Sequence, residues 1–189
     1  GAWPIDAWAV VVTAFLCMLQ GMDFVETRDA EVNLIVGFIV SLRAGVLEEI
    51  CFRWLLFLSV TVGIWILDFL LLGFMGLHIV QWIFMSILCP IANFFTLGYL
   101  APYLTGTVGG WWVAAAMISV NSRFRNGHAY LGPLGYVNSW FLGMYFFWVV
   151  FNYGIIPAMA IHFFYDLLIY AVIFVNAVME RRKGLRLRF

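Results

Sequence analysis

Long apolar segments constrain the fold of this chain more than any other feature of its sequence. Of its 189 residues, 65% are hydrophobic and 11% are charged, whereas a soluble domain is about half apolar and a quarter charged. A hydrophobic segment of about 18 or more residues is typical of a transmembrane helix. We therefore expect an all-α, polytopic transmembrane bundle of six to eight helices, forming a single transmembrane domain over residues 1–189.

Short polar segments, prolines and glycines divide the chain into expected helices. Residues 4–22 are expected to form the first membrane helix, and residues 23–31 an acidic loop. The apolar residues 32–42 are too few to span a bilayer, so they either continue into the next helix or form a partial span. Further helices are expected over residues 44–72, with the two glutamates near the N-terminal end, and over residues 73–89, 91–104, 111–128 and 136–152. Residues 129–135 are expected to form the break between two of these helices. A turn at residues 152–154 is expected before the last helix, which has Pro157 in its first turn and runs to about Met179.

The charges of the chain are balanced in number but segregated in position. Ten lysine and arginine residues match ten aspartate and glutamate residues, so no excess of positive charge favours nucleic acid as a partner. A basic tail follows the last expected helix and contains Arg181, Arg182, Lys183, Arg186 and Arg188. The positive-inside rule therefore predicts a cytoplasmic C-terminal tail. The first apolar segment has no basic residues before it, so we expect no cleavable signal peptide.

Two adjacent carboxylates and an arginine stand within an otherwise apolar segment. Glu49 and Arg53 are four residues apart, so on an α-helix they share a face and can form an ion pair. Glu48 lies about 100° around the helix and has no such partner. Because an unpaired charge in hydrocarbon is costly, Glu48 is expected to face a polar cavity and to be a functional residue.

A second polar pair lies on the last expected helix. His162 and Asp166 are also four residues apart, and their neighbours are apolar. Such a pair can bind a metal ion, or it can hold the imidazole in one tautomer. It can equally be a buried polar contact that joins two helices. The residues of this helix alone leave these interpretations open.

Taken together, these residues resemble the motifs of a known family. Glu48-Glu49-x-x-x-Arg53, Phe124-x-x-x-His128 and His162-x-x-x-Asp166 are similar to the three motifs of the CPBP family and follow the same order. This family comprises the CAAX-prenyl-protease and bacteriocin-processing intramembrane proteases, also called Abi proteins. The resemblance covers residues 44–170 and requires an inserted pair of helices near residues 60–105.

The resemblance implies an intramembrane endopeptidase that cleaves near the C-terminus or in a membrane-proximal segment of its substrate. Glu48 would be the general base for a water molecule, with His128 sharing the proton. His162, supported by Asp166, would stabilise the tetrahedral oxyanion. The catalytic set is completed by Glu49 and Arg53, which would set the charge of the cavity.

A rival mechanism for the same family uses a divalent metal ion. Two histidines and two carboxylates form a plausible zinc set, namely Glu48, His128, His162 and Asp166. The expected partners are a peptide or protein substrate that reaches the bilayer, and membrane lipid. The expected location is the inner membrane of a prokaryotic cell.

One histidine competes for the second motif. Phe74 and His78 also have the spacing Phe-x-x-x-His, and His78 lies only 30 residues after Glu48. We prefer His128 because the residues that follow it match the family and because one helix separates it from His162. His78 is then expected to be a histidine that packs between helices.

Other interpretations stay open at this stage. The same polar residues could serve a non-enzymatic protein, either an ion- or proton-coupled transporter or an immunity or scaffold protein. Arg123 and Arg125 flank His128 and could bind a substrate carboxylate, bind a lipid headgroup or anchor the helix at the interface. With a cytoplasmic tail, His162 would lie about 9 Å from the outer end of its helix. This depth predicts a site that opens away from the cytoplasm and takes a membrane-anchored or exported peptide.

Overall fold

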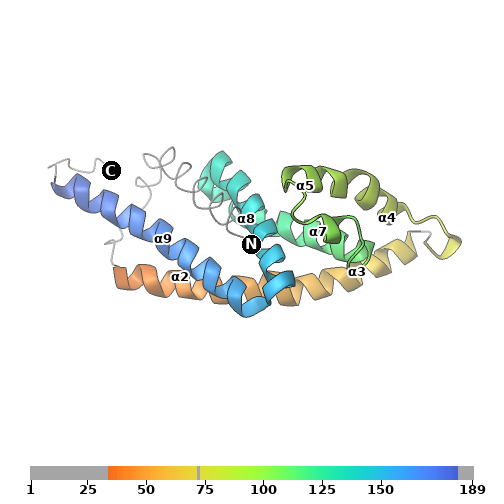
Figure 1. The fold of residues 1–189 in the computed structure, drawn as a ribbon, viewed down its shortest axis with the longest axis horizontal. Helices are drawn as coiled ribbons and strands as arrows, with labels where there is room; N and C mark the ends of the chain where they lie inside the picture. Colours follow the sequence, from red (N-terminus) through yellow and green to blue (C-terminus); the bar gives the residue numbers. More distant parts are fainter. Residues whose placement is uncertain (1–33, 72, 183–189) are drawn as a thin grey trace.

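The computed structural model describes residues 34–71 and 73–182, and this part of the chain is helical without any strand (Figure 1). The expected first helix, residues 4–22, and the acidic loop, residues 23–31, lie outside the described residues. The residues after position 182, which include most of the basic tail, also lie outside them. The predicted all-α class is therefore confirmed for the part that the structure describes.

A single helix of 37 residues, Leu34–Leu70, runs along the length of the molecule (Figure 1). It consists of α2 (Leu34–Glu48), the π-helix η2 (Glu49–Leu56) and α3 (Phe57–Leu70). Residues 32–42 thus continue into the next helix, which was one of the two alternatives. The helix contains no proline that would interrupt its hydrogen bonds. As a result, the two glutamates lie near the middle of this helix. The sequence had predicted them near the N-terminal end of a shorter one.

The second apolar helix differs from the sequence prediction. Helices α4 (Ile79–Ile83), η4 (Phe84–Leu88) and α5 (Cys89–Phe95) form one helix over Ile79–Phe95. We expected Pro90 to separate two helices, and this boundary is wrong because the helix passes through it. Pro90 occupies the first turn of α5, directly after the π-helical turn η4, and such a local change of turn accommodates the missing N–H group. Only the short helix α6 (Ala101–Leu104) follows before α7.

Three longer helices complete the fold. They are α7 (Trp111–Gly127), α8 (Gly132–Tyr153) and α9 (Ile155–Arg182), and the short 3₁₀ helix η5 (Ala129–Leu131) joins α7 to α8. The break expected over residues 129–135 is therefore shorter, because α8 already begins at Gly132. The turn between α8 and α9 is made at Gly154, whose φ of +91° favours glycine. Pro157 lies in the first turn of α9, as expected.

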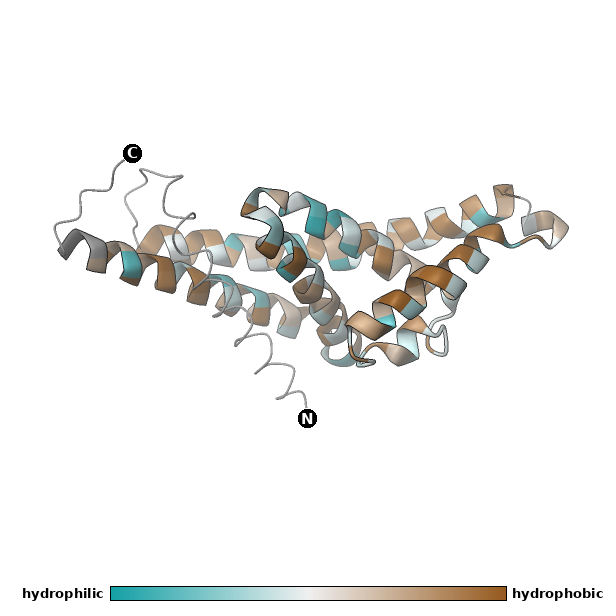
Figure 2. Cartoon of the chain, turned by 90° about the horizontal axis from the view of Figure 1, so that it is seen from above, coloured by the Kyte–Doolittle hydropathy of each residue, from teal (hydrophilic) through white to brown (hydrophobic). Residues whose placement is uncertain are grey.

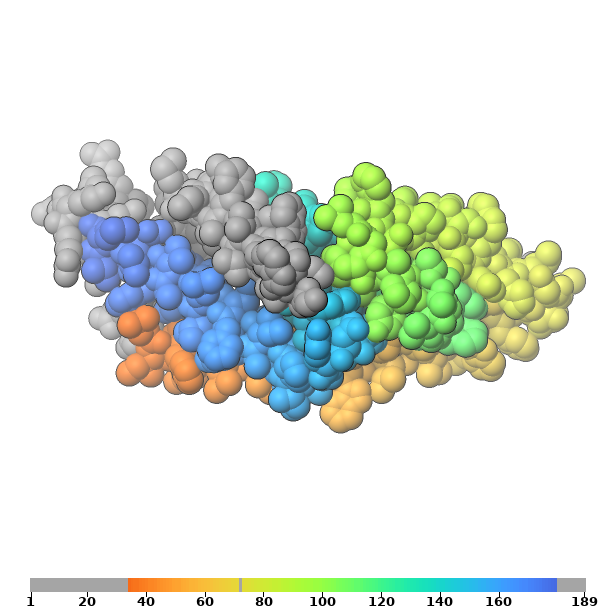
Figure 3. All heavy atoms as spheres, viewed as in Figure 1, coloured from red at the N-terminus to blue at the C-terminus, as the bar shows by residue number. Residues whose placement is uncertain are grey.

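Small residues bring α2 and α9 into close contact. Gly37, Ser41 and Gly45 recur every four residues on α2 and are buried, which is the pattern of tightly packed membrane helices. The ring of Tyr170 fills the space beside Gly37, and the backbone of α9 at Phe163 lies directly against Gly45. Figure 3 shows α9 lying along α2 over most of its length. This contact fixes α9 against the segment that carries the two glutamates.

The described helices have the surface of a membrane protein. The core lies between α7, α8 and the helices around them, where Ala114, Met117 and Phe147 are fully buried. Most large apolar side chains of α2, α3 and α9 are instead exposed, and Figure 2 shows hydrophobic residues covering most helices. Three helices are long and apolar enough to cross a bilayer, namely Leu34–Leu70, Ala129–Tyr153 and Ile155–Met179. The described residues do not confirm the predicted number of six to eight.

Candidate functional site

The structure brings the six predicted site residues together at the centre of the molecule. The long helix supplies the two glutamates and the arginine, the end of α7 supplies one histidine, and α9 supplies the other histidine and the aspartate. These residues are Glu48, Glu49, Arg53, His128, His162 and Asp166. The cluster has a buried inner layer and a partly exposed outer layer.

The inner layer is an ion-paired triad of Arg53, Glu49 and His162. Nη1 of Arg53 lies 3.2 Å from Oε1 of Glu49, and both side chains are fully buried. Nδ1 of His162 donates to the same oxygen at 2.8 Å. Arg53 also donates through Nη2 to the carbonyl oxygen of Gly143, at 3.4 Å. The ion pair expected between Glu49 and Arg53 is therefore present, and it also holds His162.

Aromatic rings surround the charged groups of the triad. The guanidinium of Arg53 lies 4.2 Å from the ring centroid of Phe124 and 5.2 Å from that of Phe146. The imidazole of His162 stacks on Phe146 with centroids 4.5 Å apart. Cation–π contacts of this kind partly replace the hydration that a buried guanidinium loses. The rings also leave His162 little freedom to rotate.

The outer layer is formed by Glu48, His128 and Asp166, which face Nε2 of His162. Oε2 of Glu48 lies 3.9 Å from Nε2 of His128 and 3.9 Å from Nε2 of His162. Oδ2 of Asp166 lies 3.6 Å from the same Nε2 of His162. The three outer side chains are between 20% and 32% exposed, whereas the side chain of His162 is 4% exposed. The cluster is therefore closed on the side of the triad and open on the side of the outer layer.

The hydrogen-bond partners assign the tautomers of both histidines. Nδ1 of His128 donates to the carbonyl oxygen of Phe124 at 2.8 Å, and Nδ1 of His162 donates to Glu49. In a neutral imidazole the other nitrogen is then an acceptor. Both Nε2 atoms consequently present lone pairs toward Oε2 of Glu48, which is buried and has no hydrogen-bond partner. A proton, a water molecule or a cation is needed between these acceptors.

The π-helix η2 begins at the second of the two adjacent glutamates, which reach the same histidine on two sides. In a regular α-helix, neighbouring residues point about 100° apart. Here Glu49 binds Nδ1 of His162 while Glu48 faces its Nε2. The change from α2 to η2 occurs between these two residues, and π-helical turns are frequent at functional sites.

The donor set suits a divalent cation in charge and chemistry. Three carboxylates and one guanidinium give a net charge of −2 when both histidines are neutral, and a divalent cation would balance it. Adjacent ligands of a tetrahedral zinc ion are roughly 3.3 Å apart, so the observed separations of 3.6 and 3.9 Å are a few tenths of an ångström too wide. Consistently, no group of three or more His, Cys, Asp or Glu side chains among the described residues is already arranged to hold a metal ion.

Three features of the site differ from the sequence-based expectation or were missed. Asp166 was expected to support His162, but Glu49 binds Nδ1 and Asp166 lies beside Nε2, with its Oδ2 3.6 Å from that atom. Gly143 was not identified, although its carbonyl oxygen accepts from Arg53 and a Cβ there would clash with Asn121. Phe146 was also missed, because nothing distinguishes it among the 19 phenylalanines of the chain.

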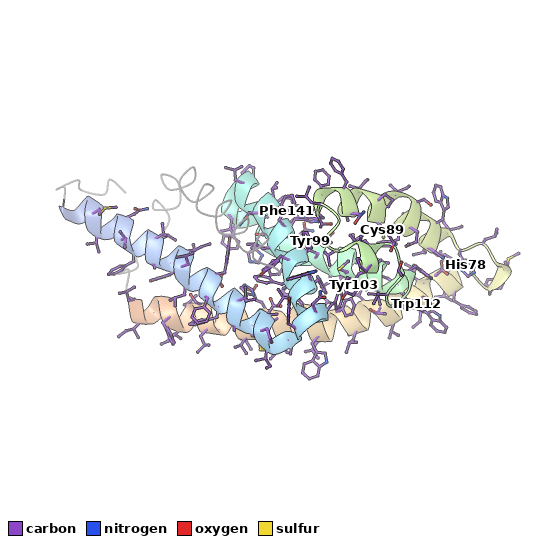
Figure 4. The ribbon with its side chains drawn as sticks, in the orientation of Figure 1. His78, Cys89, Tyr99, Tyr103, Trp112 and Phe141 are labelled. Carbon is purple, nitrogen blue, oxygen red and sulfur yellow. The ribbon has the colours of Figure 1, made fainter. Side chains whose placement is uncertain are left out.

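His78 lies apart from this cluster. Its Nδ1 is 2.7 Å from Oδ2 of Asp68, and its side chain is 52% exposed. Figure 4 shows His78 at the turn between α3 and α4, at the opposite end of the molecule from α9. The structure thus places His128, and not His78, beside Glu48.

Comparisons of this chain with family models, curated proteins and solved structures gave no match. The functional interpretation therefore depends on the three motifs and on the geometry of the cluster.

Proposed function

We propose that this chain is an intramembrane endopeptidase of the CPBP type, which hydrolyses a peptide bond with a water molecule activated by Glu48 and His128. The observation that supports this most directly is the unpaired Oε2 of Glu48, which lies 3.9 Å from Nε2 of both His128 and His162. Acceptors at this spacing can share the protons of one water molecule. The side chain of Glu48 is 32% exposed although Oε2 itself is buried, so water and a peptide would approach the cluster from this side.

The first chemical step moves a proton from the water to Glu48 or His128. As one O–H bond of the water breaks, its proton moves to Oε2 of Glu48 or Nε2 of His128, and the oxygen adds to the carbonyl carbon of the substrate. The tetrahedral intermediate then expels the amine, which takes up the same proton as the C–N bond breaks. The products are a carboxylate and an amine, so no other reactant is required.

The inner triad gives His162 its role in stabilising the intermediate. For Nε2 to donate a hydrogen bond to the oxyanion while Nδ1 donates to Glu49, the ring of His162 must carry both protons. Glu49 stabilises that imidazolium through the 2.8 Å hydrogen bond. Arg53 holds Glu49 in place and balances its charge. The triad thus positions one donor where negative charge develops in the transition state.

The same residues fit the metal-dependent variant of this function. Glu48, His128, His162 and Asp166 would hold a divalent ion, most readily zinc. Such an ion would supply Lewis-acid polarisation of the water and of the substrate carbonyl. The residues would then act as ligands, while Glu49 would still fix the tautomer of His162.

The membrane arrangement completes the proposal. The three long helices, the shorter apolar helix Ile79–Phe95, the helix α7 and the apolar segment 4–22 together support a bundle of at least six helices. The substrate is a peptide or protein that reaches the bilayer of a prokaryotic inner membrane. The basic residues after α9 favour a cytoplasmic tail.

The proposal is tested with the full chain reconstituted in lipid nanodiscs. A library of membrane-anchored peptides is incubated in water enriched in oxygen-18, and new C-termini that carry the label are identified by mass spectrometry. We expect cleavage by the native chain, none by Glu48→Gln or His162→Ala, and unchanged cleavage by the matched control His78→Gln. Normal cleavage by both site variants would refute the assignment. Absence of cleavage together with Glu48-dependent proton uptake in proteoliposomes would favour a transporter instead.

A further inference from the structure

A second cation near the cluster is held in a fixed orientation on the last turn of α7. The guanidinium of Arg125 lies over the ring of Tyr136, 4.4 Å from its centroid. Its Nε and Nη2 atoms donate to Oδ1 of Asn126 at 3.3 and 3.1 Å. The hydroxyl of Tyr136 donates to the same oxygen at 2.9 Å. The plane of the guanidinium is therefore fixed by a ring face and a shared acceptor.

The positive charge of Arg125 has no counterpart in the part of the chain that the structure describes. The ion pairs of these residues do not include Arg125, and its hydrogen-bond partner Asn126 is neutral. The charge of Arg53, in contrast, is balanced by Glu49. Nη1 of Arg125 makes no hydrogen bond within the described residues, so a planar edge of the guanidinium remains available to a ligand. A planar guanidinium edge matches the two oxygens of a carboxylate.

The position of Arg125 relates this cation to the reacting groups. Arg125 lies in the last turn of α7 and precedes His128, the residue that caps this helix, by three positions. Three peptide units keep the two Cα atoms within about 11 Å of each other. His128 faces Glu48 on the open side of the cluster. The cluster carries three carboxylates and one guanidinium, so an anionic part of a substrate is repelled from it and is attracted to the unbalanced charge of Arg125.

We propose that Arg125, positioned by Tyr136 and Asn126, binds the free C-terminal carboxylate of the peptide substrate. This inference rests on the proposed peptidase function and adds the group that selects the cleavage position. Because an extended chain spans about 3.3–3.6 Å per residue, the carboxylate at Arg125 places the scissile bond a few residues before the C-terminus. Arg125 acts in binding and makes no contact with the reacting atoms.

The test uses one substrate in two forms. The peptide that the native chain cleaves fastest in the library is synthesised with a free C-terminal carboxylate and with a C-terminal amide. We expect the native chain to prefer the acid by about tenfold or more in kcat/KM, as for other hydrogen bonds to charged groups, with the difference residing in KM. Arg125→Gln is expected to abolish this preference and Arg125→Lys to retain part of it. The matched control Arg123→Gln is expected to keep it.

Other outcomes would overturn the inference in distinguishable ways. Equal cleavage of acid and amide by the native chain would refute carboxylate recognition and leave the peptidase function standing. If Arg125→Gln lowers cleavage of both forms equally and also lowers the melting temperature, Arg125 has only a structural role at the end of α7. If its effect follows the content of anionic lipid and not the peptide terminus, the ligand is a lipid phosphate. Absence of any cleaved peptide in the library would refute the proposed function itself.

Discussion

Replacing Arg53 with methionine would leave a buried carboxylate without its cation. Arg53 and Glu49 are 3.2 Å apart and both side chains are fully buried. With an effective dielectric constant of about 20, the attraction between two such charges is about 5 kcal/mol. Removing one partner of a buried ion pair typically costs about 3–5 kcal/mol, because the other charge remains unpaired. We expect Arg53→Met to lower the free energy of unfolding by this amount.

The measurement is a double-mutant cycle in mixed micelles, with unfolding followed by circular dichroism as the denaturing detergent is increased. Glu49→Gln removes the other charge, and the double variant removes both. The double variant is expected to be more stable than the sum of the single losses predicts, by about 2 kcal/mol or more. Arg43→Met, at an exposed position of the same long helix, serves as the control and should change stability by less than about 0.5 kcal/mol. A loss below about 1 kcal/mol for Arg53→Met, or strict additivity, would refute the reasoning.

Three further predictions concern helix packing, the metal and the contact between Asp68 and His78. Gly45→Ala places a Cβ 2.7 Å from the backbone nitrogen of Phe163, so it should destabilise the chain by about 1–3 kcal/mol in the same titration, whereas Gly63→Ala, with nothing within 4 Å, should not. Peptide cleavage is expected to survive exhaustive chelation and metal-free purification, because Glu48 and His128 activate the water; a loss of cleavage that zinc restores, with Asp166→Asn needing more zinc, would instead support the metal-dependent variant. Asp68→Asn weakens the 2.7 Å contact with His78. It should speed amide hydrogen exchange only around the turn between α3 and α4, without changing cleavage. A loss of cleavage would show that this distant pair matters to the site.

The part of the site that could be predicted from the sequence is the part set by helix spacing. Glu49 and Arg53 are four residues apart, and this local relationship survives in the structure even within a π-helix. The residues that follow His128, and the single helix between it and His162, also indicated which histidine would meet Glu48. The partner of Nδ1 of His162 was not predictable, because Glu49 is 113 residues away along the chain. The nearer Asp166 was the only partner that local spacing could suggest.

In the fold, too, local sequence predicted some features, whereas others depended on contacts between distant segments. Apolar composition predicted helices that cross a membrane, and Gly154 and Pro157 marked the start of α9 correctly. The boundary at Pro90 failed because a proline interrupts a helix only where its missing hydrogen bond cannot be accommodated, and the turn η4 accommodates it. Whether residues 32–42 would continue into the glutamate segment depended on the contacts of Gly37 and Gly45 with α9, which no local pattern reveals.

The length of the helix Leu34–Leu70 has a consequence for its environment. Its 37 residues extend over about 55 Å, and large apolar side chains are exposed along its whole course. The hydrocarbon core of a bilayer is only about 30 Å thick, so burying all of this surface requires the helix to incline by roughly 57° from the bilayer normal. A thicker bilayer would let it stand more upright, and α9 would follow because Gly45 holds the two helices together. The acyl-chain length of the surrounding lipids is therefore expected to set the tilt of both helices together.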